Sequence, residues 1–168
     1  MSLFETGMLT LAGSILDICR ERGLKIATAE SCTGGLIAAC FTEIAGSSDV
    51  FDRGFVTYSN AAKQDMLGVK AETLSRYGAV SRETAKEMAQ GALDHSRASI
   101  AISVTGIAGP GGGSPEKPVG LVHIAIATSH GKASHVEHRF IDLDRSAVRL
   151  MTVRSGLQML DHFLSKSA

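Results

Sequence analysis

Ser31 is the residue in this sequence best placed to act as a nucleophile. It follows a short apolar segment typical of a buried strand and precedes Gly34 and Gly35, where a helix is expected to begin. Unpaired backbone N–H groups converge at the start of a helix and favour negative charge, so an oxyanion would be stabilised there. The same pattern fits a simpler role, in which Ser31 or Thr33 caps the helix and the glycines allow close packing. The segment does not match the GxSxG nucleophile motif.

A serine attacks only when a neighbouring group removes its proton, and the next strand-turn-helix unit supplies the candidates. Tyr58, Asn60 and Lys63 lie at its strand end and in the first turns of its helix. Lys63 is the candidate base, a role that requires burial or a nearby cation to lower its pKa from about 10.4. The alternative is an ordinary surface lysine. Because the local spacing is not the SxxK of penicillin-binding proteins, a pairing of Ser31 with Lys63 must come from the fold.

The segment 105–120, TGIAGPGGGSPEKPVG, contains too much glycine and proline for regular structure. It follows an apolar strand, at the edge where open α/β sheets form ligand crevices. Thr105, Gly106 and Gly109 are therefore candidates for contact with a phosphate or a ribose. The segment matches neither GxGxxG nor GxxxxGKS/T, which argues against both common nucleotide motifs, and a flexible connector is the alternative.

Arg145 lies with Asp142 and Asp144 at the expected start of the last helix. A cation in the first turn opposes the helix dipole, so a phosphate or carboxylate ligand would explain its position. An ion pair with either aspartate would explain it equally well.

Composition argues against several classes of protein. The 168 residues include 17 Lys and Arg and 17 Asp and Glu, a formal net charge of zero, so nucleic acid is not an expected partner. No apolar stretch approaches the roughly 20 residues that span a bilayer, so no membrane contact is expected. Three cysteines without CxxC spacing favour a reducing cytoplasm. His135 and His138 fall on opposite faces of a strand without further ligands, so we predict no metal site.

Hydrophobic periodicity and turn residues predict one α/β domain over residues 1–168. Its about five strands and about six helices favour a three-layer α/β/α sandwich on a mixed sheet, with the last two strands forming an antiparallel hairpin. The expected strands are 24–29, 54–58, 98–104, 121–128 and 133–140. The expected helices are 3–22, 36–42, 61–67, 69–77, 81–95 and a long final helix capped by Asp142 or Asp144.

Five ordered motifs together resemble the C-terminal domain family of the competence/damage-inducible protein CinA. They cover nearly the whole chain and read AESCTGGL, GSS, GFVTYSNAAKQDMLGV, GAVSRETAKEMAQGA and TGIAGPGGGSPEKPVG. The resemblance implies hydrolysis of the carboxamide of nicotinamide mononucleotide to nicotinate mononucleotide and ammonia, a step of pyridine nucleotide salvage. It implies no metal and no organic cofactor, and by analogy a homo-oligomer.

The family's nucleophile falls on Ser31, its assisting residues on Tyr58 and Lys63, and a substrate-contacting arginine on Arg145. Lys63 would take the proton of Ser31 directly or through Tyr58, and backbone N–H groups of residues 32–35 would hold the oxyanion. The other candidate substrate contacts are Thr33, Gly34, Gly35, Asn60, Thr105, Gly106 and Gly109. The phosphate could bind at the helix start near Gly34 or at Arg145, but the helix start cannot serve both phosphate and oxyanion.

Three alternatives remain open on the sequence alone. Cys32 could be mistaken for the nucleophile, although its side chain should diverge from that of Ser31. The domain could be a non-catalytic nucleotide-binding or regulatory module, because a fold alone proves no chemistry. It could also hydrolyse a different small amide or ester.

Overall fold

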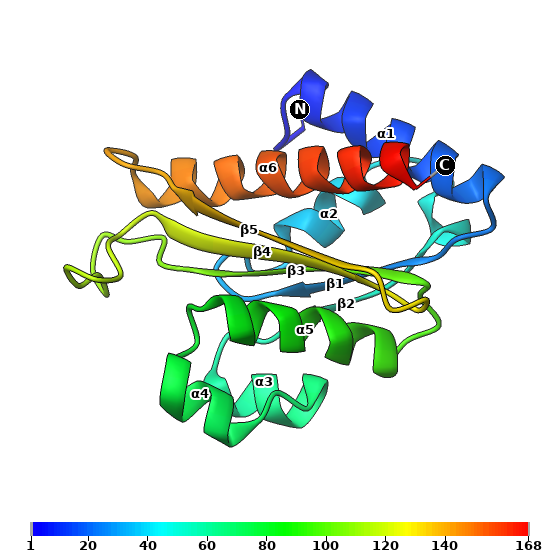
Figure 1. Ribbon diagram of the computed structural model, residues 1–168. Helices are drawn as coiled ribbons and strands as arrows, with labels where there is room; N and C mark the ends of the chain where they lie inside the picture. Colours follow the sequence, from blue (N-terminus) through cyan, green and yellow to red (C-terminus); the bar gives the residue numbers. More distant parts are fainter. Residues whose placement is uncertain (1, 168) are drawn as a thin grey trace.

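A computed structural model describes residues 2–167 and contains one five-stranded mixed sheet (Figure 1). The strands are β1 (Ile26–Glu30), β2 (Phe51–Val56), β3 (Ile100–Gly106), β4 (Leu121–Thr128) and β5 (Ala133–Arg139). Their order in the sheet is β2-β1-β3-β4-β5. β2, β1 and β3 run parallel, whereas β4 and β5 form an antiparallel hairpin. The carboxyl ends of the three parallel strands therefore meet at one edge.

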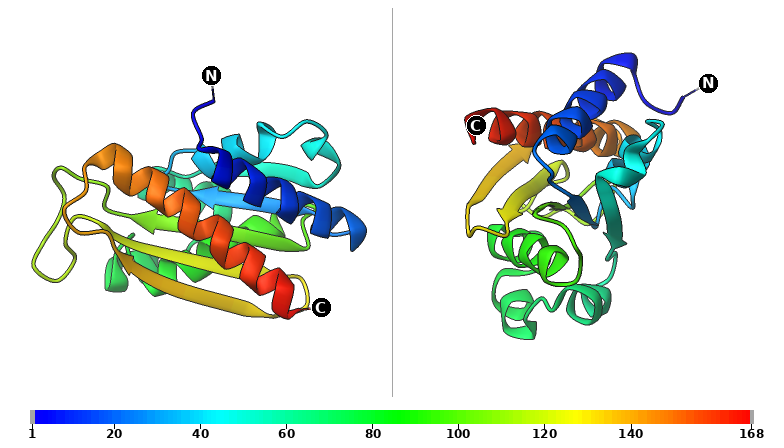
Figure 2. Two further views of the ribbon diagram at one scale, coloured as in Figure 1. Left: turned by 90° about the horizontal axis from the view of Figure 1, so that it is seen from above. Right: turned by 90° about the vertical axis from the view of Figure 1, so that its right-hand side faces the viewer.

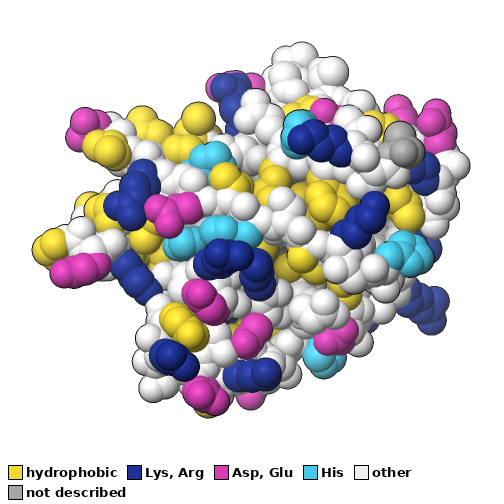
Figure 3. All heavy atoms as spheres, in the orientation of Figure 1, with side chains coloured by type: hydrophobic (Ala, Val, Ile, Leu, Met, Phe, Trp, Pro, Cys, Tyr) yellow, Lys and Arg dark blue, Asp and Glu magenta, His cyan; other side chains and the backbone are white. Residues whose placement is uncertain are grey.

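Helices cover both faces of the sheet and confirm the predicted three-layer α/β/α architecture (Figures 1 and 2). One layer consists of α1 (Thr6–Glu21), α2 (Leu36–Thr42) and α6 (Arg145–Lys166). The other contains α5 (Arg82–Asp94), with α3 (Asn60–Leu67) and α4 (Ala71–Tyr77) on the same side. Among residues 2–167, no helix combines the length and apolarity needed to cross a lipid bilayer. Basic and acidic side chains are interspersed over the face seen in Figure 3.

The alternation of side chains along the central strands divides the core into two parts. On β1, Ile26 packs into the cluster beneath α1, α2 and α6, whereas Ala27 and Ala29 pack toward α5. β3 alternates in the same way, with Ile102 on the first side and Ala101 on the second. Successive side chains of a strand point to opposite faces, so residues at the end of β1 are directed alternately toward α2 and toward the α3 side.

Most predicted elements are confirmed, and the largest difference lies before the second strand. β2 begins at Phe51 rather than residue 54 and ends at Val56, and a short 3-10 helix, η1 (Ser47–Asp49), precedes it. The sequence did not predict the start of this strand because Asp52 and Arg53 interrupt its apolar pattern. Pairing with β1 determines where the strand begins. The cap of the last helix is Asp144, whose carboxylate accepts a hydrogen bond from the Ala147 amide.

Substitution of Gly91 by alanine should destabilise the fold. Gly91 lies in α5, where an added Cβ would overlap the backbone of Leu67 at the end of α3. The expected loss is about 1–3 kcal/mol, the usual cost of overpacking, measured by denaturant unfolding. Gly13→Ala in α1 is the matched control, because an added Cβ there has open space and should stabilise by about 0.5–1 kcal/mol. Equal stability of the two variants would contradict the assigned α3–α5 packing.

Candidate active site

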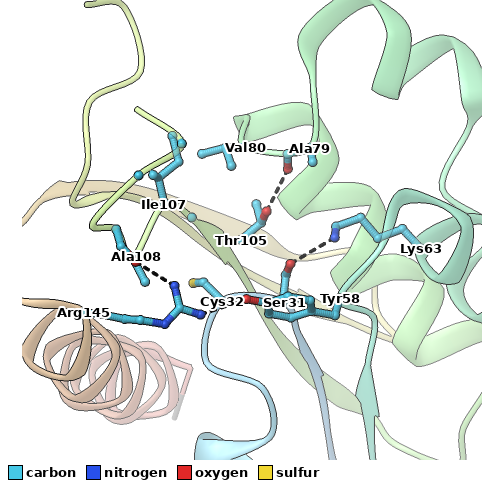
Figure 4. Close-up of a pocket in the computed structure, with 14 residues that line it drawn as sticks. Ser31, Cys32, Tyr58, Lys63, Ala79, Val80, Thr105, Ile107, Ala108 and Arg145 are labelled. Atoms are coloured by element: carbon cyan, nitrogen blue, oxygen red, sulfur yellow. Dashed lines mark hydrogen bonds between the residues drawn. The ribbon is translucent and has the colours of Figure 1, made fainter. Parts of the chain in front are cut away.

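The site centres on a direct hydrogen bond between Ser31 and Lys63 (Figure 4). Ser31 directly follows β1, and Lys63 lies in the first turns of α3, which follows β2. The Lys63 Nζ atom lies 3.0 Å from Ser31 Oγ and 2.8 Å from the carbonyl oxygen of Thr57. β1 and β2 are parallel neighbours, and this pairing brings the residues after both strands together. The fold thus supplies the contact that local spacing could not predict.

Lys63 is buried, with only 1% of its surface exposed. Loss of solvation disfavours the ammonium form and lowers the pKa of Lys63 from its usual value. No carboxylate in the described part of the chain forms an ion pair with Lys63 to offset this effect. The neutral amine can accept the Ser31 hydroxyl proton while it donates to the carbonyl of Thr57. The arrangement therefore suits a general base.

A cavity of about 280 Å³ opens at this pair, close to the lower end of the range for small-molecule sites. It collects the predicted site residues Ser31, Tyr58, Lys63, Thr105, Gly106, Gly109 and Arg145. The predicted contacts Thr33, Gly34, Gly35 and Asn60 are not among its lining residues. The Thr105 hydroxyl donates to the Ala79 carbonyl at 2.8 Å, so it joins β3 to the segment before α5 (Figure 4).

Arg145 connects two walls of the cavity. Its Nη1 atom donates to the Gly109 carbonyl at 2.7 Å, and its Nη2 atom donates to the Tyr58 hydroxyl oxygen at 2.9 Å. Arg145 is the first residue of α6, and no ion pair joins it to Asp142 or Asp144 within residues 2–167. No hydrogen bond in the same range joins Tyr58 to Ser31 or Lys63. The Ser31–Lys63 contact is direct and needs no relay through Tyr58.

The start of α2 differs from the expectation, because a side chain already occupies it. The Glu30 carboxylate is 1% exposed and accepts hydrogen bonds from the Thr33 hydroxyl (2.5 Å) and from the amides of Gly35 (3.2 Å), Ile37 (3.0 Å) and Ala38 (2.9 Å). Ser31 and Thr33 provide no cap, because neither hydroxyl accepts from an α2 amide. These amides are therefore unavailable to a phosphate or an oxyanion.

The backbone amides that follow Ser31 now fall into two groups. The Gly34 amide donates to the Ser31 carbonyl at 3.0 Å, and that of Gly35 donates to Glu30. Within the described residues, the amides of Cys32 and Thr33 donate to no oxygen. Of the amides at positions 32–35, only these two lack an acceptor, and of the two residues only Cys32 lines the cavity.

Arg149 supports the same turn from the other side, and sequence reasoning did not single it out. Its Nε atom donates to the Cys32 carbonyl and its Nη2 atom to the Thr33 carbonyl, both at 3.1 Å. Arg149 lies one helical turn after Arg145, so both residues share one face of α6. That spacing was the available sequence signal. For Glu30 the signal was a carboxylate at the end of a buried strand, which requires hydrogen-bond donors nearby.

Cys32 lines the cavity but is a poor nucleophile. Burial, reinforced by the neighbouring Glu30 carboxylate, raises the pKa of its thiol to about 12. A thiol in this state contains almost no thiolate near neutral pH, and the thiolate is the reactive form. The Ser31 hydroxyl, in contrast, is in contact with the Lys63 amine. The geometry therefore favours Ser31 over Cys32.

The comparisons with known proteins agree with this fold. The CinA C-terminal domain model matches residues 8–164, and the chain belongs to that family. Among solved structures, it is similar to the competence/damage inducible protein CihA from Agrobacterium tumefaciens, with a TM-score of 0.95 and 59% identity, covering 98% of this chain and 99% of that one. It is also similar to the competence damage-inducible protein A (ComA) from Klebsiella pneumoniae, with a TM-score of 0.90 and 37% identity, covering 94% and 97%.

Curated relatives of two different lengths match the chain. It is 49% identical over 156 residues to the nicotinamide-nucleotide amidohydrolase PncC of Escherichia coli, covering 93% of this chain and 94% of that protein. It is 51% identical over 148 residues to a CinA-like protein of Leptospira borgpetersenii, covering 88% of this chain but 35% of that protein. The chain thus spans about a third of the length of several curated relatives that it matches.

The three cysteines should resist alkylation in the native protein. Burial raises the pKa of Cys32 to about 12 and those of Cys19 and Cys40 to about 11. At pH 8 the folded protein should therefore take up iodoacetamide far more slowly than the same protein in denaturant, as followed by mass spectrometry. Unfolding returns the thiols to a pKa near 8.5 and exposes them. Rapid native labelling of Cys32 would contradict its assignment as an inert thiol.

Proposed function

We propose that this protein hydrolyses the carboxamide of nicotinamide mononucleotide to nicotinate mononucleotide and ammonia. The observation that carries the proposal is the 3.0 Å contact between Ser31 Oγ and the buried Lys63 Nζ at the cavity. The name and near-complete overlap of the amidohydrolase relative from Escherichia coli support the choice of substrate. A serine with a neutral amine as its base is chemistry suited to opening an amide.

In the proposed reaction, Ser31 Oγ attacks the carboxamide carbon while Lys63 Nζ accepts the hydroxyl proton. The tetrahedral intermediate collapses as the C–N bond breaks, and Lys63 returns the proton to the departing ammonia. This leaves the nicotinate acyl group as an ester on Ser31. A water molecule, deprotonated by Lys63, then attacks the ester carbon, and the proton passes back to Ser31 as the acid leaves. No metal ion and no organic cofactor takes part in these steps.

We assign the oxyanion to the free amide of Cys32, because Cys32 lines the cavity whereas Thr33 does not. The amide of the residue after the nucleophile is a common donor in serine hydrolases of other folds. A well-placed donor of this kind contributes about 3–4 kcal/mol to transition-state stabilisation. This assignment replaces the wider expectation for residues 32–35, because the Gly34 and Gly35 amides already have acceptors.

We assign the phosphate to Arg145 rather than to the start of α2. The Glu30 carboxylate occupies that helix start, and a second anion there would meet its negative charge. The Arg145 guanidinium has five N–H donors, and two hydrogen bonds are formed in this structure. Thr105, Gly106 and Gly109 complete the proposed substrate wall. Thr33, Gly34, Gly35 and Asn60 no longer have a supporting contact with the cavity.

We further propose a homo-oligomer in the cytoplasm that serves pyridine nucleotide salvage. The three cysteines are buried and unpaired, which suits a reducing compartment. The oligomer and the pathway rest on the family analogy.

Ser31→Ala should abolish ammonia release from nicotinamide mononucleotide while the thermal melt remains that of the wild type. The reason is that loss of Oγ removes the attacking atom but leaves the core intact. Ammonia is measured with a coupled assay, and ligand binding by calorimetry. Ser47→Ala is the matched control, because Ser47 is also buried, at 7% exposure, but lies outside the cavity lining.

Unchanged turnover in Ser31→Ala would rule out the serine mechanism. Saturable binding by the wild type without ammonia would instead identify a non-catalytic nucleotide-binding module. Turnover of other amides in preference to the mononucleotide would correct the substrate but keep the chemistry.

Lys63 should produce the acidic limb of the pH profile. Only the free amine can accept the serine proton, so kcat/KM should rise with pH as Lys63 deprotonates, with a midpoint below the usual value of about 10.4 because burial lowers its pKa. Lys63→Met should lose at least about a hundredfold in kcat and lack this limb. Lys70→Met, at an exposed position just after α3, is the control and should keep both. A Lys63→Met profile that retained the limb would exclude Lys63 as the base.

A further inference from the structure

We propose that Glu30 is a positioning residue for the reaction: its buried carboxylate fixes the turn that carries Ser31 and, through the backbone, the segment that holds Lys63. This inference rests on the proposed function. The Glu30 cap, as we call it, consists of that carboxylate with its four donors, which are the Thr33 hydroxyl and the amides of Gly35, Ile37 and Ala38. No comparison or motif described above assigns Glu30 a role.

The Glu30 cap is unusual because a charged group is buried without a cationic partner. Glu30 is 1% exposed, and no Lys or Arg forms an ion pair with it within residues 2–167. A buried carboxylate without such donors would be strongly destabilising. Oε2 accepts from Thr33, Gly35 and Ile37, and Oε1 accepts from Ala38. Each of these donors lies just beyond Ser31, so the carboxylate holds the far side of the turn.

The backbone of Glu30 connects the two reacting residues. Its carbonyl accepts a hydrogen bond from the Thr57 amide at 2.9 Å, and the Thr57 carbonyl accepts the one from Lys63 Nζ at 2.8 Å. The next amide along the chain, that of Ser31, donates to the Val104 carbonyl on β3 at 3.0 Å. A shift of the Glu30 backbone would therefore move Ser31 together with the Thr57 carbonyl that accepts the hydrogen bond from Lys63.

Arg149 opposes the Glu30 cap from the other side of the turn. Its guanidinium donates to the carbonyls of Cys32 and Thr33, while Glu30 accepts from the Thr33 hydroxyl. The Glu30 carboxylate thus accepts hydrogen bonds from one side of the turn, and the Arg149 guanidinium donates hydrogen bonds to its carbonyls from the other side. Such double restraint leaves the free Cys32 amide and Ser31 Oγ in a fixed mutual position. A misplacement of about 1 Å can cost a hundredfold in rate.

Thr33→Val tests the Glu30 cap with little change of shape. It removes one of the four donors, and Thr33 lies outside the cavity lining. We expect kcat to fall about tenfold or more while KM changes less than about twofold, because the ground-state contacts remain and only the reacting geometry loosens. Thr33→Ser restores the hydroxyl and should recover most of kcat.

Thr28→Val is the matched control. Thr28 is as buried as Thr33 and lies on β1, the strand that carries Glu30, but its hydroxyl has no hydrogen-bond partner in the described structure. Thr28→Val should therefore keep the kcat of the wild type. Glu30→Gln is the second variant, since its amide group replaces one acceptor oxygen with a donor facing the backbone amides. Its kcat should fall further than that of Thr33→Val.

Several results would overturn the role of Glu30. They are an unchanged kcat in Thr33→Val, an effect of Thr33→Val on KM alone, a loss of kcat of the same size in Thr28→Val, or no recovery of kcat in Thr33→Ser.

Absence of ammonia release by the wild type would overturn the proposed function instead. In that case, the rate at which a fluorophosphonate labels Ser31 still tests the cap: slower labelling of Thr33→Val than of Thr28→Val supports it, and equal rates or no labelling of the wild type refute it.

Discussion

A lysine amine buried against a serine hydroxyl is the interaction on which the rest of this site depends. Water would stabilise the ammonium form, and burial removes that stabilisation, so the pKa of Lys63 is lowered in the direction that favours the free amine. The contact requires two chain segments to end beside each other. Parallel pairing of β1 with β2 meets that requirement, because it places the turn after β1 next to the helix that follows β2.

The charged groups near this amine are arranged so that none pairs with it. Glu30 directs its carboxylate to the start of α2, and Arg149 directs its guanidinium to two carbonyls of the turn. Arg145 lies further along α6, at the mouth of the cavity, with Tyr58 and Gly109. The positive charge proposed to bind the phosphate is therefore separated from the Ser31–Lys63 pair proposed to act on the amide. A nucleotide with a carboxamide at its other end presents its groups in that same order.

The sequence was sufficient for the architecture and for naming Ser31 and Lys63 as candidates, whose contact the fold supplies, but not for the groups that support them. Ser31, Lys63 and Arg145 could be named as candidates because each lies just after a strand or within the first turn of a helix, near the edge where open sheets collect ligands. Glu30 was missed because its partners are mainly backbone amides, which carry no sequence signal until α2 is folded. Arg149 was missed for a similar reason, since its acceptors are carbonyls more than a hundred residues away. Glycines at the helix start suggested an open anion site, yet the neighbouring carboxylate had already filled it.

The alternation of side chains along β1 has a consequence for how this gene can vary. Glu30 and Ser31 are adjacent but serve opposite faces of the sheet, one toward α2 and the other toward Lys63. Deletion or insertion of a single codon within this strand would exchange those directions. The carboxylate would then meet the amine, form an ion pair and keep it protonated, while the hydroxyl would face the amides of α2. The spacing inside this short strand therefore matters to the arrangement as much as the identity of the residues that the strand presents.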